Sequence, residues 1–165
     1  MFKIQTLNNI SVAGLNRLPR ERYEIASELS HPDAILVRSA KMHDLPVPDG
    51  LKAIGRAGAG VNNIPVPAMT ERGIAVFNAP GANANAVKEL VLAGMLIAAR
   101  NIAQGWQFAR GLDGDDAAIG KAVEAGKKQF VGFELPGRTL GVIGLGAIGV
   151  LVANAARALG MKVIG

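Results

Sequence analysis

The sequence predicts an α/β protein built on parallel β-sheets. Short apolar segments alternate with helical stretches along most of the chain, a pattern typical of βαβ units. Glycine accounts for 21 of the 165 residues and aromatic residues for only 4%, and half of the residues are hydrophobic. This composition favours a packed α/β domain with many tight strand-to-helix turns over an aromatic-rich binding surface.

The first half of the chain contains alternating strand and helix signals. Residues 2–7 alternate apolar and polar side chains, as a half-buried strand does. Gly73 stops a short helix, and the run Asn78-Ala79-Pro80-Gly81 is a loop signal that closes a strand. We expect strands over residues 2–7, 34–38, 51–57 and 74–77, and helices over residues 20–29 and 67–72.

The second half begins with a long apolar stretch. Residues 85–110 have helical periodicity and are apolar on most sides, so we expect one buried helix that connects two domains. Residues 111–126 predict a loop with a short surface helix. A strand over 138–143 leads into a helix over 150–159, for which Gly160 is the expected stop, and a further strand starts at 161–164.

Charge and composition exclude several classes of function. The chain carries 18 Lys+Arg and 13 Asp+Glu, a net charge of +5, but the basic residues are dispersed and not interleaved with aromatics, so no nucleic-acid partner is expected. Cysteine is absent, which excludes disulfides, thiolate zinc sites and a cysteine nucleophile, and no metal site is expected. The longest apolar run, Leu90–Ala99, is too short to cross a bilayer, and no signal peptide follows Met1. We expect a cytoplasmic protein without a membrane partner.

Gly144, Gly146 and Gly149 form a G-x-G-x-x-G run between the predicted strand 138–143 and the helix that follows. In a dinucleotide-binding turn the first glycine makes the tight turn, the second admits the pyrophosphate and the third lets helix and strand pack closely. The alternative is a purely structural turn in another doubly wound fold. The position of a ribose-binding acidic residue, about 20 residues further on, falls at or after Gly165, so NAD and NADP both stay open.

Several segments resemble the D-isomer-specific 2-hydroxyacid dehydrogenases. Residues 51–64 (LKAIGRAGAGVNNI) are similar to the substrate-domain loop of that family, and residues 76–83 (VFNAPGAN) with 87–90 (VKEL) to its entry into an interdomain helix. Residues 137–144 (GRTLGVIG) match its run into the glycine turn. The segments stand in the family's order and spacing. Within the family, Val37-Arg38-Ser39 most resembles the subgroup that oxidises D-3-phosphoglycerate in serine synthesis.

The resemblance implies a flavodoxin-like substrate domain over residues 1–98 and the start of a Rossmann-type NAD domain over residues 99–165. It also implies hydride transfer from a small anionic 2-hydroxy acid to NAD, and a homo-oligomer when the protein is complete. The family's catalytic histidine, its glutamate partner and its substrate-orienting arginine lie later in relatives, so no catalytic residue maps here and we expect the 165-residue chain alone to be inactive. His31 and His43 are interpreted as surface residues.

Arg38 and Ser39 are candidate substrate-binding residues. Arg38 ends a strand on the side of a parallel sheet where ligands bind, and a guanidinium beside a hydroxyl suits a phosphate or carboxylate. A solvated strand-end arginine is the alternative. Gly58, Ala59 and Gly60 can turn successive N–H groups toward an anion, although the same residues also suit an ordinary turn.

By resemblance, the Gly58–Gly60 loop holds the substrate carboxylate, with Ala59 also near the nicotinamide. Asn83 matches a position that approaches substrate, although its residue type also suits a helix N-cap, and Val87 matches one near the nicotinamide. Gly144, Gly146, Ala147, Ile148 and Gly149 correspond to the pyrophosphate turn. Two positions depart from the family pattern: Ala147 replaces a longer basic or polar residue, and Lys88 replaces a small one.

Three functions stay open at this point. The first is a fragment of an enzyme that oxidises D-3-phosphoglycerate. The second is another D-2-hydroxyacid dehydrogenase, such as a glyoxylate or hydroxypyruvate reductase. The third is a non-catalytic dinucleotide-binding protein of the same fold.

Overall fold

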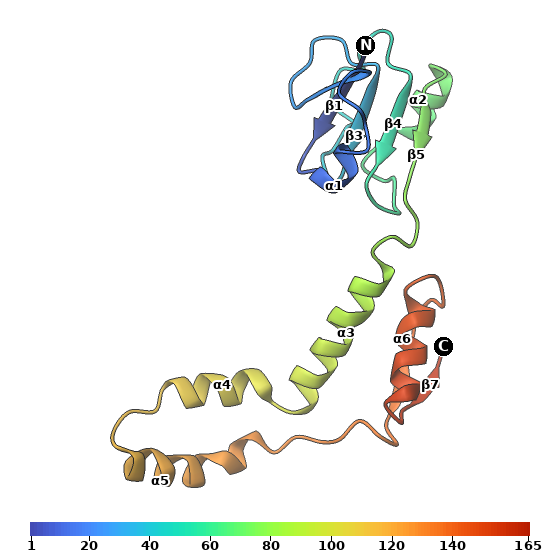
Figure 1. The fold of residues 1–165 in the computed structure, drawn as a ribbon. Helices are drawn as coiled ribbons and strands as arrows, with labels where there is room; N and C mark the ends of the chain where they lie inside the picture. Colours follow the sequence, from blue (N-terminus) through green and yellow to red (C-terminus); the bar gives the residue numbers. More distant parts are fainter. The chain divides into compact units, whose positions relative to one another are not determined.

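The computed structural model describes residues 1–165, which divide into two compact units, Met1–Asn83 and Ala84–Gly165 (Figure 1). The division precedes helix α3 (Ala84–Ala99), so the contacts of the chain group this helix with the second unit. The boundary expected from the sequence lies later, after residue 98. The assignment of residues 1–98 to a substrate domain and 99–165 to a cofactor domain stays a prediction.

The first unit is a five-stranded parallel sheet in the order β2-β1-β3-β4-β5. Helix α2 starts at Pro65-Val66-Pro67, where proline suits the first helical positions, and α1 is a single short turn. The parallel sheet confirms the predicted α/β class. The elements are β1 (Phe2–Leu7), α1 (Val12–Leu15), β2 (Tyr23–Ala26), β3 (Ala34–Val37), β4 (Ala53–Arg56), α2 (Val66–Glu71) and β5 (Ala75–Phe77).

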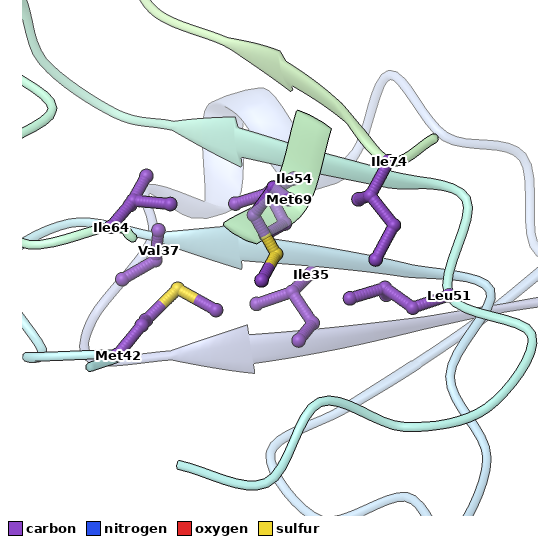
Figure 2. Packing of buried hydrophobic residues seen from close by; sticks show 8 residues of the cluster. All are labelled: Ile35, Val37, Met42, Leu51, Ile54, Ile64, Met69 and Ile74. Atoms are coloured by element: carbon purple, nitrogen blue, oxygen red, sulfur yellow. The ribbon is translucent and has the colours of Figure 1, made fainter. Parts of the chain in front are cut away.

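The core of the first unit lies on one face of this sheet. Ile35 pairs with Ile54 in register across β3 and β4, and Met69 of α2 packs against them (Figure 2). Alternate residues of a strand point to the same face, so Val37 joins Ile35 on this side. The complete buried cluster is Ile35, Val37, Met42, Leu51, Ile54, Ile64, Met69 and Ile74.

The prediction of a helix over residues 20–29 is wrong, because Tyr23–Ala26 forms strand β2. A turn closed by the Arg22 N–H and the Pro19 carbonyl, 3.0 Å apart, precedes this strand. Tyr23 then pairs with Phe2 of β1, with ring centroids 6.0 Å apart. A β-branched or aromatic residue at every second position suits a strand, and this edge pairing outweighs the polar composition.

The prediction of a single helix over residues 85–110 is also wrong, because this stretch forms two helices, α3 and α4 (Ile102–Arg110). The break lies at Asn101, whose φ of 50° and ψ of 37° place it in the left-handed region that asparagine tolerates. The Asn101 side-chain amide donates to the Val131 carbonyl at 3.1 Å, and the Phe133 N–H donates to the Ala99 carbonyl at 2.8 Å. Val131 and Phe133, later in the chain, therefore hydrogen-bond the residues at the C-terminal end of α3.

Residues 111–126 contain more helix than expected. Asp115 caps α5 (Asp116–Gly126), since its Oδ1 accepts the Ala118 N–H at 2.8 Å. A short 3-10 helix, η1 (Lys127–Phe130), follows directly. Phe108 of α4 packs against Phe130 of η1, with ring centroids 5.2 Å apart, and this contact joins the elements on either side of α5.

The end of the second unit confirms the predicted strand–turn–helix–strand order. Strand β6 (Thr139–Gly141) leads through the glycine turn into α6 (Gly149–Ala158), and β7 (Lys162–Ile164) pairs with β6 in parallel. Gly160 follows α6 with φ of 79°, the left-handed stop expected from the sequence.

Candidate functional site

The candidate substrate residues lie at the carboxyl edge of the first unit's sheet. Because all five strands are parallel, their carboxyl ends meet at one edge, which is where α/β sheets bind ligands. Arg38 and Ser39 directly follow β3, and the Gly58–Gly60 loop follows β4 after one residue. The register pair Val37–Arg56 and the 2.8 Å bond from the Ala57 N–H to the Val37 carbonyl bring these two loops together.

The turn that carries Arg38 and Ser39 is held by Asn8, at the end of β1. Asn8 has φ of 70°, and its Oδ1 accepts the backbone N–H groups of Ser39 at 2.8 Å and Ala40 at 2.6 Å. The side chain replaces the partners that these two N–H groups lose when the strand ends.

Two further asparagines hold the loops that follow β4. The Asn78 side-chain amide donates to the Ala59 carbonyl at 2.7 Å, and the Ala79 N–H donates to the Gly58 carbonyl at 2.9 Å. The Asn63 amide donates to the Ala40 carbonyl at 2.9 Å. Hydrogen bonds therefore link the loops after β1, β3, β4 and β5, and the candidate residues sit on a fixed backbone.

This edge leaves several donors free, beside one buried acceptor without a partner, Asn63 Oδ1. Arg38 and Ser39 are exposed, and Arg38 belongs to none of the four ion pairs of the chain. The backbone N–H groups of Ala59 and Gly60 donate to no backbone carbonyl. A guanidinium, a hydroxyl and turn N–H groups on neighbouring loops suit a small anion.

Asn83 and Val87 occupy the start of α3. Asn83 is exposed, directly precedes the helix and makes no side-chain hydrogen bond, while Val87 is half-buried in the first turn. Lys88 has a local role: its Nζ donates to Asn85 Oδ1 at 2.5 Å, and Asn85 Nδ2 donates to Glu89 at 2.7 Å. This chain of polar contacts explains how a lysine is accommodated there.

The glycine turn of the second unit has the geometry that each glycine was expected to supply. Gly144 has φ of 93°, which disfavours a side chain, and a Cβ on Gly149 would collide with the Gly144 carbonyl. A Cβ on Gly146, by contrast, would meet no atom within 4 Å. The turn borders an open pocket of about 340 Å³, which Val91 of α3 also lines.

The backbone of this turn fits a dinucleotide pyrophosphate. The N–H groups of Gly146, Ala147 and Ile148 donate to no backbone carbonyl, and they precede the ten-residue helix α6. A helix N-terminus carries a partial positive charge that favours phosphate, and the open side of Gly146 admits close approach. Ala147 is exposed and adds no polar side-chain contact.

The sequence interpretation missed the residues that support the substrate loops. Asn8, Asn63 and Asn78 each lie next to the end of a strand or within the loop after it, where their side chains hydrogen-bond neighbouring backbone. The available signal was an asparagine after an apolar strand, because asparagine tolerates left-handed backbone and competes for backbone groups.

Both histidines are exposed, in keeping with their interpretation as surface residues. No three histidine, aspartate or glutamate side chains gather in a way that would hold a metal ion. None of the helices combines the length and the apolar character that crossing a bilayer requires.

Comparison with known proteins decides the family. The family model described as D-isomer specific 2-hydroxyacid dehydrogenase, catalytic domain, matches residues 3–163. The chain belongs to this dehydrogenase family.

Among curated relatives, the D-3-phosphoglycerate dehydrogenase of Methanocaldococcus jannaschii is 45% identical over 145 residues, which cover 86% of this chain and 26% of that protein. The D-3-phosphoglycerate dehydrogenase of Archaeoglobus fulgidus is 43% identical over 149 residues, covering 87% of this chain and 26% of that protein. The chain thus spans about a quarter of the length of these relatives.

Solved structures of the same fold agree with this assignment. The TT0316 protein of Thermus thermophilus matches with a TM-score of 0.78 and 28% identity, over 98% of this chain and 55% of that one. The NAD+-bound 3-phosphoglycerate dehydrogenase of Entamoeba histolytica matches with a TM-score of 0.69 and 25% identity, over 98% and 52%. An NADPH-dependent glyoxylate/hydroxypyruvate reductase of Sinorhizobium meliloti matches with 0.76 and 25%, over 99% and 53%.

Proposed function

We propose that this member of the dehydrogenase family is the N-terminal part of an NAD-dependent D-3-phosphoglycerate dehydrogenase, which oxidises the C2 hydroxyl of 3-phosphoglycerate on the route to L-serine. The observation that carries the proposal is the position of Arg38 and Ser39 beside the Gly58–Gly60 loop. The substrate has two anionic groups, and this edge offers two sets of donors. The 45% identity to a D-3-phosphoglycerate dehydrogenase supports the same substrate.

In the proposed complex each end of the substrate has its own partner. The free N–H groups of Ala59 and Gly60 hold the carboxylate, and the planar guanidinium of Arg38 binds phosphate oxygens with the Ser39 hydroxyl beside it. Asn8 and Asn78 keep the two loops in place. Such fixed donors hold the reacting carbon at one position, which is what hydride transfer requires.

The glycine turn holds the cofactor in this proposal. The N–H groups of Gly146, Ala147 and Ile148 bind the pyrophosphate, and Gly144 and Gly149 shape the turn. On the family resemblance alone, we assign Ala59 and Val87 to the nicotinamide and Asn83 to the substrate. A bound nicotinamide dinucleotide supplies the hydride acceptor. We propose NAD, with NADP as the alternative.

Two other functions remain as alternatives. A glyoxylate or hydroxypyruvate reductase uses a substrate without phosphate, and the relative from S. meliloti keeps this possibility open. A non-catalytic dinucleotide-binding protein of the same fold would bind the cofactor without turnover. The cytoplasmic location and a homo-oligomer of the complete protein stay predictions.

Binding measurements on the 165-residue chain test the proposal. We expect D-3-phosphoglycerate to bind more tightly than glyoxylate or hydroxypyruvate in calorimetric titrations, and Arg38→Gln to remove that preference. Arg20→Gln is the matched control, because Arg20 is exposed in the turn before β2, at the opposite edge of the sheet. Equal affinity for all three acids would favour the reductase alternative.

A cofactor titration complements this test. We expect NADH fluorescence to change on addition of the chain more than NADPH fluorescence does at equal concentration. We also expect no turnover of 3-phosphoglycerate with NAD by these 165 residues, because the family resemblance places the catalytic histidine and its glutamate partner outside them. Measurable turnover would contradict that expectation.

A further inference from the structure

The loop between α4 and α5 (Figure 1) contains an aspartate directly followed by a glycine, Asp113-Gly114. The Gly114 N–H donates to the Asp113 side-chain oxygen Oδ1 at 2.9 Å. The carboxyl carbon of Asp113 is bonded to that oxygen, so this carbon also lies close to the Gly114 nitrogen. Holding two reacting groups next to each other raises the rate at which a bond forms between them.

The surroundings leave this pair of residues accessible and without other partners. Asp113 and Gly114 are both exposed, so water reaches them. Gly114 has φ of 123°, in a region that favours glycine, and it has no Cβ that would shield its nitrogen. Its N–H donates to no backbone carbonyl. The Asp113 carboxylate belongs to none of the four ion pairs of the chain, and Gly114 is its hydrogen-bond partner.

We propose that Asp113-Gly114 is a site of covalent modification without an enzyme, at which the aspartate isomerises to isoaspartate through a cyclic imide. In the first step the Gly114 nitrogen attacks the carboxyl carbon of Asp113, and a new C–N bond forms. The hydroxyl group of the carboxylic acid leaves as water together with the amide proton of Gly114. The imide nitrogen is then bonded to both the main-chain and the side-chain carbonyl carbon of Asp113.

In the second step water opens the imide at either of its carbonyl carbons. Addition of water to the side-chain carbonyl breaks the new C–N bond and restores aspartate. Addition to the main-chain carbonyl breaks the original peptide bond, so the chain continues through the Asp113 side chain and the main-chain carbon becomes a free carboxylate. The water lost in the first step is regained, so the mass is unchanged and no oxidant, reductant or other reactant is consumed.

Isomerisation adds a carbon atom to the backbone directly before the cap of α5. Asp115 follows Gly114, and its Oδ1 accepts the Ala118 N–H at 2.8 Å at the start of the helix. The modification therefore alters the connection between α4 and a helix whose first turn depends on the next residue. The inference does not rest on the proposed function, because Asp113 and Gly114 belong to neither proposed binding site.

A second aspartate–glycine pair, Asp49-Gly50, provides a comparison within the same chain. Both of its residues are exposed, and Gly50 also has a positive φ, of 85°. The Asp49 carboxylate, however, faces Arg72, with 3.5 Å between Oδ1 and the Arg72 Nη2, and it accepts no hydrogen bond from the Gly50 N–H. The two pairs share residue types and exposure, and they differ in the contact between the carboxylate and the next backbone nitrogen.

The test incubates the 165-residue chain and its Asp113→Glu variant at neutral pH and physiological temperature, in buffer and in urea. Trypsin then places the two pairs in separate peptides, residues 42–52 and residues 111–121, because it cleaves after lysine and arginine. Chromatography separates aspartate and isoaspartate forms of equal mass, and fragmentation in the mass spectrometer locates the isomerised residue. Asp113→Glu keeps the charge, but its longer side chain forms the corresponding ring far more slowly.

We expect isoaspartate to form about threefold or more faster at residue 113 than at residue 49 in the folded chain, and at equal rates in urea, where the contact is lost. Asp113→Glu should abolish the isomer of peptide 111–121 and leave peptide 42–52 unchanged.

Three outcomes overturn the inference. The first is equal accumulation at the two residues in the folded chain, or none at residue 113. The second is the same excess at residue 113 in urea, which would assign the reaction to the local sequence and not to the contact. The third is an isomer of peptide 111–121 that persists in Asp113→Glu, which would place the reaction at Asp115 or Asp116.

Discussion

The side-chain oxygen of Asn8 lies 2.8 Å from the backbone nitrogen of Ser39, 31 residues later in the chain. It also accepts the next N–H, that of Ala40, at 2.6 Å. One amide at the end of β1 thus fixes the first residues after β3, which include Arg38. The backbone next to Arg38, the arginine proposed to bind phosphate, is therefore held by a residue that itself has no charge.

Asn8→Ala is expected to weaken both the fold and ligand binding. Loss of the acceptor leaves two N–H groups without a partner, which costs about 1–3 kcal/mol in the free energy of unfolding. Affinity for D-3-phosphoglycerate should fall as well, because the Arg38 turn is no longer held. Urea unfolding and calorimetric titration measure the two effects.

Two other variants test whether the lost hydrogen bonds of Asn8 cause these losses of stability and affinity. Asn8→Asp keeps an acceptor oxygen and should retain most of the stability. Asn9→Ala changes an exposed neighbour with no side-chain hydrogen bond, so it should unfold like the unsubstituted chain. A loss in Asn9→Ala equal to that in Asn8→Ala would assign the effect to the chain segment and not to the hydrogen bonds.

The core of the first unit depends on Ile54, which is fully buried in one cluster with Ile35 of β3 and Met69 of α2 (Figure 2). Ile54→Ala leaves a cavity in the buried hydrophobic cluster of the first unit. We therefore expect a loss of about 2–5 kcal/mol in the free energy of unfolding. Leu90→Ala is the comparison, since Leu90 is 72% exposed, and it should cost far less. Similar losses from the two substitutions in urea unfolding would contradict the assigned core.

Most of the strands and the glycine turn were predictable because their signals are local. The alternation of residues 2–7 and the glycines at 144, 146 and 149 depend on neighbours within a few residues. Strand β2 was missed because its pairing with Phe2 spans more than 20 residues, and such pairing overrides a polar composition. The break at Asn101 was missed for the same reason, since the Val131 carbonyl that supports it lies 30 residues away.

The same difference between local sequence signals and long-range contacts applies to the candidate site. Arg38, Ser39 and the Gly58–Gly60 loop were predicted from residue types that suit anion binding at strand ends together with the family resemblance, and their role stays a prediction. Asn8, Asn63 and Asn78 were not singled out. Their importance arises from hydrogen bonds between loops that the fold brings together, and a sequence does not display such contacts.

Asp33 predicts a dependence of stability on pH. It lies just before β3, and a hydrogen bond from Lys52 lowers the pKa of its carboxyl group, with a smaller contribution from the Lys3 N–H at 2.9 Å. A carboxyl group whose pKa is lower in the folded state stabilises the fold above its unfolded pKa. This stabilisation is lost as the pH falls through the folded pKa.

We therefore expect the Tm to fall on acidification below about pH 4, and Asp33→Asn to show a smaller fall over the same range. Asp49→Asn is the control, because the Asp49 carboxylate is fully exposed and lies 3.5 Å from Arg72 in a weak surface pair. A pH profile of Asp33→Asn parallel to that of the unsubstituted chain would remove Asp33 as the cause.

The second and third glycines of the turn, Gly146 and Gly149, should respond differently to substitution by alanine. A Cβ at Gly149 collides with the Gly144 carbonyl, so Gly149→Ala should destabilise the second unit by about 1–3 kcal/mol.

A Cβ at Gly146 meets open space, so Gly146→Ala should keep the Tm of the unsubstituted chain. The same Cβ projects from the backbone that is proposed to receive the pyrophosphate, and Gly146→Ala should therefore reduce NADH binding about tenfold or more. Fluorescence titration with NADH, read beside thermal unfolding, distinguishes the two effects. Unimpaired NADH binding by a folded Gly146→Ala chain would mean that the turn is structural, because a dinucleotide cannot approach that backbone without meeting the added methyl group.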